Sequence, residues 1–298
     1  MNKYDAGEIR ALFERGQNII EWIAAREGAA TNSETAILYS YDAQAGSYVA
    51  ELKDETRRRF KDEFGRRLAA VLDALDPLSL LDAGTGEATS LAPVLRHMTA
   101  RPDHVLGFDL SLSRLLYARQ YLAEEQQREV ALFTAALDRI PLASDSVDVV
   151  MTIHAVEPNR GREDVILREL LRVARRHLVL IEPSFELSSA EGRARMERLG
   201  YVRALPAALE RLGHPAARIE PWPLNANPLN PAALIVVDKH GSRPDSVPAY
   251  VSPISGRALV PREHCWFCPD DGHAFPMIAG IPCLTVESGI LASKLGQF

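Results

Sequence analysis

The stretch LLDAGTGEAT, Leu80 to Thr89, decides the fold of this chain. A short apolar run leads directly into two glycines, Gly84 and Gly86, which is the pattern of a strand that ends in a tight turn. A ligand can approach bare backbone amides at such a turn, particularly where a helix begins after it. The loop therefore predicts a site for a nucleotide-like cofactor, although glycine pairs also close ordinary turns between strands and helices.

The composition places the chain among ordinary globular proteins. Its 298 residues are enough for one large or two modest domains, and 47% of them are hydrophobic and 25% charged. A net charge of -6 gives no overall attraction to nucleic acid or to an anionic membrane. The sequence has neither a long apolar run nor the apolar core of a signal peptide at MNKYDAGEIR, so we expect a cytoplasmic protein without a membrane partner.

The first 77 residues predict a helical lid. Apolar residues at helical spacing predict one amphipathic helix over Glu8 to Ala24 and a longer one from Leu52 to Leu72, which ends before Pro77. The segment between them, Ile37 to Leu52, mixes aromatic residues with glycine and serine and predicts a loop or short helices.

After Pro77 the pattern changes to strands that alternate with helices. This alternation predicts a parallel, doubly wound sheet whose ligands bind at the carboxyl ends of the strands. Two further apolar runs, Ala217 to Trp222 and Ala233 to Asp238, predict an antiparallel hairpin at its edge. The expected parallel strands are Leu78 to Asp82, Val105 to Asp109, Val130 to Thr134, Val147 to Thr152 and Leu178 to Glu182.

Asp109 ends the second expected strand, roughly 20 residues after the glycine loop. A βαβ unit brings a carboxylate at that separation to the ribose of a bound nucleotide. A carboxylate there can accept hydrogen bonds from both ribose hydroxyls. The alternative is that Asp109, together with Ser111, only caps the helix that follows.

Two residues of the loop bear on which nucleotide binds. A dinucleotide site requires a third glycine, where this chain has Thr89. Asp82 precedes the glycines, and its negative charge would repel phosphates and favour a ligand with a cationic centre and an amino group. S-adenosylmethionine has both groups, so we expect it as the cofactor in preference to NAD.

At this point the chain resembles the class I S-adenosylmethionine-dependent methyltransferases over roughly residues 39–239. The resemblance implies a Rossmann-like seven-stranded sheet, a helical N-terminal lid at 1–77 and a methyltransferase core at 78–240. SYDAQAGSY, residues 40–48, is similar to the aromatic lid of many members. The matching segments, in order, are LLDAGTGEA, GFDLS (107–111), LDRIPLASDSVDVVMT (137–152) and LRELLRVARRHLVLIEPS (167–184).

The resemblance also implies a set of cofactor-binding residues. Many members carry an aspartate for the adenine amino group where this chain has Ala135 and Ala136, so adenine would rest on backbone groups and apolar side chains. The predicted cofactor site comprises Tyr41, Asp82, Gly84, Thr85, Gly86, Asp109, Leu110, Ala136, Leu137 and Thr152.

The segment after the fourth expected strand, TIHAVEPNRG, is where this fold places the methyl acceptor. Methyl transfer depends mainly on orientation, and a base is needed only for some acceptors. His154 could take a proton from a hydroxyl, with Glu157 beside it, or it could simply pack within the loop. The segment lacks the Asn-Pro-Pro-Tyr-like tetrapeptide of family members that methylate planar amino groups. We therefore expect an oxygen, carbon or aliphatic nitrogen acceptor in a small molecule, lipid precursor or glycan.

Residues 241–298 contain the three cysteines of the chain: Cys265, Cys268 and Cys283. This β-rich segment resembles a zinc-ribbon-derived module, similar to the small activator subunit of several tRNA and translation-factor methyltransferases. A ribbon binds zinc through two C-x-x-C pairs, where this chain reads Ser252-Pro-Ile-Ser255 and Cys268-Pro-Asp-Asp271. We expect a degenerate ribbon without metal, held by apolar packing; the alternative is a zinc site built on Cys265 and Cys268.

Three other functions stay open on the sequence. The C-terminal resemblance allows RNA or a translation-associated protein as the substrate, and the alanine at 136 allows a non-catalytic scaffold that only binds the cofactor. An NAD-dependent oxidoreductase is opposed by Thr89 and Asp82. No basic stripe interleaved with aromatic residues is present, and Arg57, Arg58, Arg59 and Lys61 predict a solvated helix face. We therefore expect a small-molecule or glycan substrate and no nucleic acid.

Overall fold

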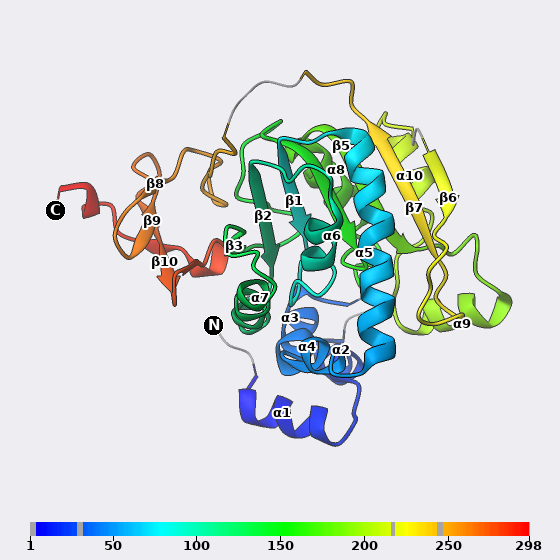
Figure 1. Ribbon diagram of the computed structural model, residues 1–298. Coiled ribbons are helices and arrows are strands. Elements are labelled where there is room, and N and C mark those ends of the chain that lie inside the picture. Colours follow the sequence, from blue (N-terminus) through cyan, green and yellow to red (C-terminus); the bar gives the residue numbers. More distant parts are fainter. Residues whose placement is uncertain (1–3, 29–31, 216–217, 243–246, 298) are drawn as a thin grey trace.

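The computed structural model describes the chain except for residues 1–3, 29–31, 216–217, 243–246 and 298. Its centre is a seven-stranded sheet with the order β3-β2-β1-β4-β5-β7-β6 (Figure 1). This is a Rossmann-like α/β sheet, as the alternation of strands and helices predicts. The strands are β1 (Ser79–Ala83), β2 (His104–Asp109), β3 (Ala131–Thr134), β4 (Val147–Ile153), β5 (Ala174–Pro183), β6 (Arg218–Pro221) and β7 (Ala232–Asp238).

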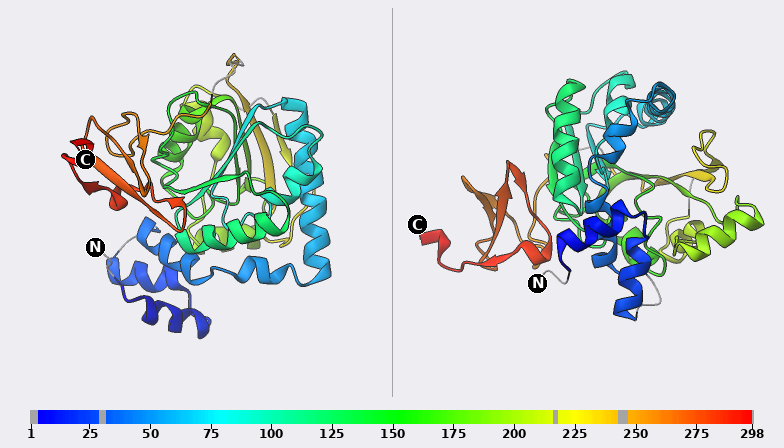
Figure 2. Two further views of the ribbon diagram at one scale, coloured as in Figure 1. Left: turned by 60° about the vertical axis from the view of Figure 1, so that its left-hand side comes forward. Right: turned by 90° about the horizontal axis from the view of Figure 1, so that it is seen from below.

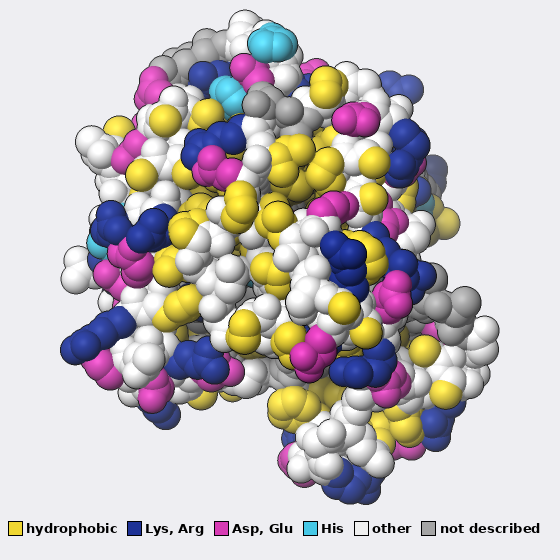
Figure 3. Space-filling model, turned by 90° about the vertical axis from the view of Figure 1, so that its right-hand side faces the viewer, with side chains coloured by type: hydrophobic (Ala, Val, Ile, Leu, Met, Phe, Trp, Pro, Cys, Tyr) yellow, Lys and Arg dark blue, Asp and Glu magenta, His cyan; other side chains and the backbone are white. Residues whose placement is uncertain are grey.

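Strands β1 to β5 run parallel, and the last two strands form the predicted antiparallel hairpin. β1 and β4 are wholly buried or nearly so, because helices cover both faces of the sheet. β6 lies at the edge and leaves Ile219 51% exposed. Figure 3 views the molecule from this side, where hydrophobic side chains lie among interspersed basic and acidic ones.

Helices pack on both faces of the sheet. α5, α6 and α7 pack on one face, and α8 and α10 pack on the other. Within the described part of the chain, no helix combines the length and the apolar character that a bilayer span requires. The helices of the core are α5 (Glu55–Leu75), α6 (Leu91–His97), α7 (Leu112–Glu124), α8 (Glu163–Val173), α9 (Ala190–Arg198) and α10 (Leu205–Arg211).

The N-terminal segment folds into four short helices beside the carboxyl ends of the strands (Figure 1): α1 (Ala6–Glu14), α2 (Ile19–Glu27), α3 (Glu34–Ala43) and α4 (Ser47–Glu51). The prediction of one helix over Glu8 to Ala24 is wrong. Gly16 has a φ of 69°, which ends the first helix, and the side chain of Asn18 caps the second by accepting the amide of Glu21.

No helix lies between β3 and β4. A separate small antiparallel sheet from the C-terminal segment covers the core there, beside the β3 edge (Figure 2). Tyr250 packs edge-to-face against Phe133 with ring centroids 5.5 Å apart, and Phe275 is fully buried in the same cluster. The strands of the small sheet are β8 (Val260–Pro261), β9 (Cys265–Phe267), β10 (His273–Ile278), β11 (Ile281–Pro282) and β12 (Ile290–Leu291).

The C-terminal segment also pairs with the edge of the main sheet. Thr134 and Cys283 form a parallel bridge, and the amide of Leu284 donates to the carbonyl of Thr134 at 3.1 Å. The carbonyl of Thr134, which lies at this open edge of β3, is therefore satisfied. Thr134 is directly followed by the Ala135–Ala136 segment expected to face adenine, so the C-terminal sheet braces that segment.

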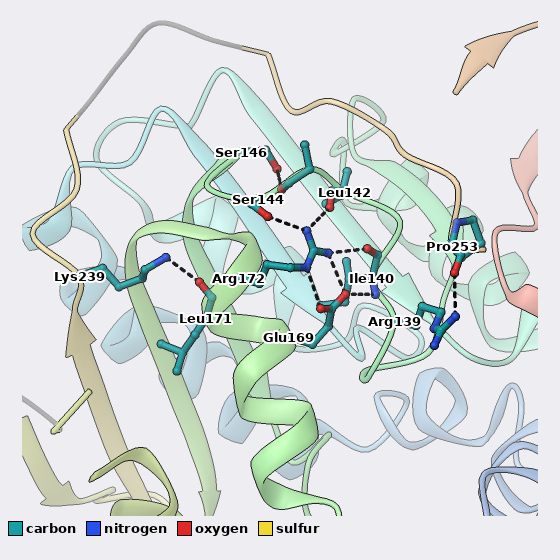
Figure 4. Close-up of polar contacts among 11 residues, drawn as sticks. Arg139, Ile140, Leu142, Ser144, Ser146, Glu169, Leu171, Arg172, Lys239 and Pro253 are labelled. Carbon is teal, nitrogen blue, oxygen red and sulfur yellow. Dashed lines mark hydrogen bonds and ion pairs between the residues drawn. The ribbon is translucent and has the colours of Figure 1, made fainter. Parts of the chain in front are cut away.

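Arg172 holds the loop from β3 to β4 (Figure 4). Arg172 of α8 donates to the carbonyls of Ile140 and Leu142 at 2.9 and 2.8 Å, and it pairs with Glu169 at 2.7 Å. Just before Ile140 in the loop, Arg139 donates to the carbonyl of Pro253 at 3.2 Å. These contacts hold the loop to α8 on one side and to the C-terminal segment on the other.

Candidate functional site

A cavity of about 350 Å³ lies at the carboxyl ends of the parallel strands, beneath α3 and α4. Its position is the one that an open α/β sheet offers to a ligand. Of the residues predicted for the site, three do not line the cavity: Asp82, Gly86 and Thr152. The predicted residues that line it are Tyr41, Gly84, Thr85, Asp109, Leu110, Ala136, Leu137, His154 and Glu157.

The amides of the glycine loop are not bare. Those of Gly84 and Thr85 donate to the carbonyl of Phe108 at 2.9 and 2.8 Å, and that of Gly86 donates to Asp109 Oδ2 at 3.0 Å. The left-handed backbone at both glycines turns these amides back onto β2. α6 begins only at Leu91, so these three amides are neither free nor at the start of a helix, and contact of the loop with a ligand stays a prediction.

The two glycines are required by close neighbours. A Cβ on Gly84 would lie 2.3 Å from the Cβ of Ala155, and one on Gly86 would lie 2.4 Å from the guanidinium of Arg114. Both positions also have positive φ angles, 81° and 58°. Gly84 therefore lets the segment after β4 approach the loop, which brings the expected acceptor residues against the expected cofactor residues.

Asp109 is held with its carboxylate toward the cavity. Oδ1 accepts the amide of Ser111 at 2.9 Å, and Oδ2 lies 3.4 Å from Arg114 Nη1. The hydroxyl of Ser111 caps α7 by accepting the amide of Arg114 at 3.2 Å. Because Ser111 supplies the cap, capping does not account for the carboxylate of Asp109.

Sequence reasoning missed Arg114, which lines the cavity. Its guanidinium lies 5.1 Å from the ring of Tyr41 and 4.8 Å from that of Tyr48, and its Nε has no hydrogen-bond partner. Arg114 therefore connects the aromatic side chains of α3 and α4 with Asp109 at the end of β2. Its position five residues after Asp109, at the start of α7, is the sequence signal that could have indicated it.

The lid is attached to the glycine loop by Glu87. Its two carboxylate oxygens accept the amides of Gly46 and Val49 at 2.9 and 2.7 Å, at the start of α4. The hydroxyl of Ser111 donates to Asp42 of α3 at 2.7 Å. α3 and α4 are therefore fixed over the cavity by hydrogen bonds to the same loops that form its floor.

Lys61 of α5 also lines the cavity, so the prediction that it belongs to a solvated face is wrong. Its ammonium donates to Ser90 Oγ at 2.8 Å. Burial lowers its pKa to about 8. Arg58 and Arg59 are exposed as predicted and pair with Glu55. Lys61 lies beside the buried face of α5. At such a position, a small rotation of the helix about its axis determines whether the side chain points into solvent or into the cavity.

His154 and Glu157 form a hydrogen-bonded pair in the cavity wall. His154 Nδ1 lies 2.7 Å from Glu157 Oε2. His154 has a φ of 55°, which is uncommon for a residue with a side chain. Burial lowers the pKa of His154, but the hydrogen bond and charge of Glu157 outweigh burial, so that the pKa lies above its ordinary value.

Glu182, at the end of β5, fixes the backbone that carries this pair. Its Oε1 accepts the hydroxyl of Thr152 at 2.8 Å and the amides of Ala155 and Val156 at 3.0 and 3.1 Å. Its Oε2 accepts the amide of Glu157 at 3.1 Å. Burial raises the pKa of Glu182 to about 7. Thr152 thus supports the segment after β4 through Glu182.

Asp82 lies beneath the loop at 2% exposure, and burial raises its pKa to about 7. Its predicted contact with a cationic ligand stays a prediction, as do those of Gly86 and Thr152. Across the described residues, no group of three or more His, Cys, Asp or Glu side chains is arranged to hold a metal ion.

Comparisons with known proteins find a methyltransferase domain in this chain. A family model described as a methyltransferase domain matches residues 80–178, which span the strands from β1 to β5. No curated protein matches the sequence.

Solved structures are similar at low identity. A provisionally assigned O-methyltransferase from Nostoc punctiforme is 12% identical, with 64% of this chain and 60% of that chain covered and a TM-score of 0.51. Magnesium protoporphyrin IX methyltransferase from Synechocystis, with bound S-adenosylhomocysteine, is 15% identical over 78% of this chain and 99% of that chain, with a TM-score of 0.48. At these identities the similarity concerns the fold alone.

The matched residues carry the glycine loop, Asp109 and the His154–Glu157 pair, which lie at or just after the carboxyl ends of β1, β2 and β4. Residues 80–178 therefore match a methyltransferase domain, and this match supports an enzyme that takes its methyl group from S-adenosylmethionine.

Proposed function

We propose that this protein transfers the methyl group of S-adenosylmethionine to an oxygen atom of a small molecule, lipid precursor or glycan. The observation that carries this proposal is the His154–Glu157 pair, 2.7 Å apart in the wall of the cavity. Methylation of a hydroxyl requires that its proton be removed, and an imidazole oriented by a carboxylate is suited to that task. A carbon or aliphatic nitrogen acceptor is the alternative.

The reaction that we propose is an in-line displacement. The acceptor oxygen forms a bond to the methyl carbon as the bond from carbon to sulfur breaks, and S-adenosylhomocysteine leaves. Nε2 of His154 takes the hydroxyl proton, while Glu157 holds Nδ1–H and stabilises the imidazolium. The protein contributes the orientation of the two reactants in a cavity covered by α3 and α4.

The residues around the cavity suit the parts of this cofactor. Asp109 would accept the ribose hydroxyls, and Leu110, Ala136 and Leu137 would contact adenine. The cation of Lys61 suits the carboxylate of the methionine moiety. Tyr41 would cover the cofactor from α3. These assignments rest on the shared cavity wall and on the chemistry of each side chain.

A small acceptor agrees better with the surface than RNA does. On the face shown in Figure 3, Lys and Arg side chains alternate with Asp and Glu, and the whole chain has a net charge of -6. Binding of a nucleic acid depends on clustered positive charge that replaces counterions along the backbone. RNA and a protein substrate are nevertheless separate outcomes of the test below.

We also propose that residues 241–298 are a degenerate zinc-ribbon-like module with a structural role. Ser255 Oγ donates to Asp271 Oδ2 and lies 3.9 Å from Cys268 Sγ. Hydrogen bonds from Ser252, Ser255 and Cys268 offset the burial of Asp271 and lower the pKa of this carboxyl to about 2. The four positions that align with zinc ligands thus meet in space, where hydrogen bonds take the place of metal bonds.

The experiment is to incubate the protein with methyl-labelled cofactor and a cell extract separated into metabolite, glycan, RNA and protein fractions. The proposal predicts label in the metabolite or glycan fraction, on an oxygen atom, and its loss with His154→Ala. Label in RNA or protein would assign the alternative substrate class. Cofactor binding without transfer to any fraction would contradict the proposed reaction.

A further inference from the structure

A second cavity, of about 210 Å³, adjoins the cofactor cavity. Tyr48, Lys61, Ile153 and His154 line both cavities, so the two spaces meet at the proposed base. α4, α5, the end of β4 and the loop between β6 and β7 enclose the second one. A molecule in it would lie against residues that also line the cofactor cavity.

The walls of the second cavity are mainly apolar. Phe60 and Phe64 lie on successive turns of α5 with ring centroids 6.5 Å apart, and Leu52 and Leu224 complete the apolar lining. Among the described residues of the wall, one buried side-chain polar atom has no hydrogen-bond partner. This atom is Oδ1 of Asn230, in the loop between β6 and β7. A buried polar atom of this kind is free to bond a polar group of a ligand.

Two cations face the same space from one side of α5. Arg57 and Lys61 are four residues apart and therefore project from the same face of the helix. Glu51 also lines the cavity, and its charge acts on Lys61. Arg57 forms no ion pair with the described residues, whereas the neighbouring Arg58 and Arg59 are both paired with Glu55. Arg57 is exposed, and its guanidinium is therefore free to pair with an anionic group of a ligand in this cavity.

We propose that the second cavity is the acceptor site and that it takes a small molecule with an apolar ring or short chain and an anionic group that Arg57 binds. This inference rests on the proposed function. The apolar part lies between Phe60, Phe64 and Leu224, and the hydroxyl to be methylated reaches His154 at the shared wall. The volume is below the roughly 300–1,000 Å³ typical of sites for drug-sized ligands. The buried part of the acceptor is therefore about the size of one ring.

Binding of two matched probes tests the site without knowledge of the natural acceptor. Phenylacetate carries a ring and a carboxylate, and phenylacetamide has the same shape without the charge. We expect phenylacetate to bind about fivefold more tightly in ligand-observed NMR titrations. Arg57→Gln should abolish this preference, and Arg58→Gln, on the same helix, should leave it unchanged.

The apolar wall is tested with the same probes. Phe60→Ala should weaken the binding of both probes, whereas Phe13→Ala, at a surface position that is 40% exposed, should weaken neither. The proposal is overturned if neither probe binds the wild-type protein, if both bind equally, or if the preference for phenylacetate survives in Arg57→Gln.

Failure of the acceptor site and failure of the proposed function are distinguishable. Titration with S-adenosylhomocysteine in parallel reports on the cofactor cavity, and the probe titrations are run both with and without it. Normal cofactor binding without probe binding would reject the acceptor site alone. If the probes bind in the predicted pattern but S-adenosylhomocysteine does not bind, the proposed methyl transfer is rejected. The second cavity would then still be an apolar site that binds anions.

Discussion

Nδ1 of His154 lies 2.7 Å from Oε2 of Glu157, on a segment whose backbone amides Glu182 holds. The bond to Glu157 fixes the ring and places a proton on Nδ1, which leaves Nε2 unprotonated in the neutral imidazole. Because His154 lines both cavities, the free nitrogen belongs to the wall that cofactor and acceptor would share. The geometry is that of a general base with an orienting carboxylate.

Glu157→Gln should shift the pH dependence of methyl transfer. The neutral imidazole is the active form, so the rate rises with pH through the pKa of His154, which Glu157 raises above its ordinary value. With glutamine, burial dominates and lowers that pKa, so the acid limb of kcat should move to lower pH while the maximal rate falls. Glu129→Gln, at an exposed position, is the control. If the acid limb of kcat does not move, Glu157 is not the group that raises the pKa of His154.

His154→Ala should lower kcat by about 10²–10⁴-fold, the usual contribution of a general base. Binding of S-adenosylhomocysteine should remain, because the proposed ribose and adenine contacts lie elsewhere in the cavity. Single-turnover transfer and calorimetry measure the two effects separately. A normal rate would remove His154 from the chemistry and leave it as part of the loop.

Asp109→Asn should weaken binding of S-adenosylhomocysteine by about 1.5–3 kcal/mol, the range for hydrogen bonds to a charged group. The amide can accept fewer hydrogen bonds than the carboxylate that now binds the amides of Gly86 and Ser111. Asp103→Asn, on the exposed surface, serves as the comparison in calorimetric titrations. Equal affinity of both variants and the wild type would show that Asp109 does not hold the cofactor.

Gly84→Ala should abolish most activity, because its Cβ would overlap Ala155 and displace the segment that carries His154. Gly213→Ala is a matched control: its φ of 78° is close to the 81° of Gly84, but nothing lies within 4 Å of its Cβ position. Both variants place an alanine at a positive φ angle, but only the variant at Gly84 also brings a Cβ into overlap with Ala155. If activity and melting temperature fall equally in the two, the close approach of Ala155 is not the reason for the glycine.

The triple variant Ser252→Cys, Ser255→Cys and Asp271→Cys should bind zinc. Together with Cys268 it would present four thiolates at positions that already meet in space. Zinc should raise its melting temperature, and cobalt should give the absorption of a tetrahedral thiolate site. Addition of Cys268→Ser should remove both effects. A triple variant that folds without binding either metal would contradict the degenerate-ribbon proposal.

The sequence predicts the sheet well because its central strands, such as β1 and β4, are buried and appear as continuous apolar runs. β1 to β5 and the β6–β7 hairpin all lie close to their predicted positions. The break between α1 and α2 was missed, although Gly16 and Asn18 are ordinary end and cap signals. Apolar spacing continued across that turn and concealed it.

The site was predicted less completely than the sheet. Residues fixed to strand ends, such as Asp109 and His154, are placed by the topology, and they do line the cavity. Arg114 and Lys61 lie on helices, where helix rotation and packing decide whether a charged side chain faces solvent or a cavity. Sequence spacing alone does not contain that information, and it likewise did not show that the loop amides bond back to β2.

The central claim is that cofactor and base meet at His154, and the complex with S-adenosylhomocysteine tests it most directly. A crystal structure of that complex is predicted to show the ribose hydroxyls bonded to Asp109 and the sulfur atom facing the wall that His154 and Ile153 form. S-adenosylhomocysteine bound outside this cavity, or bound with its sulfur turned away from His154, would contradict the account.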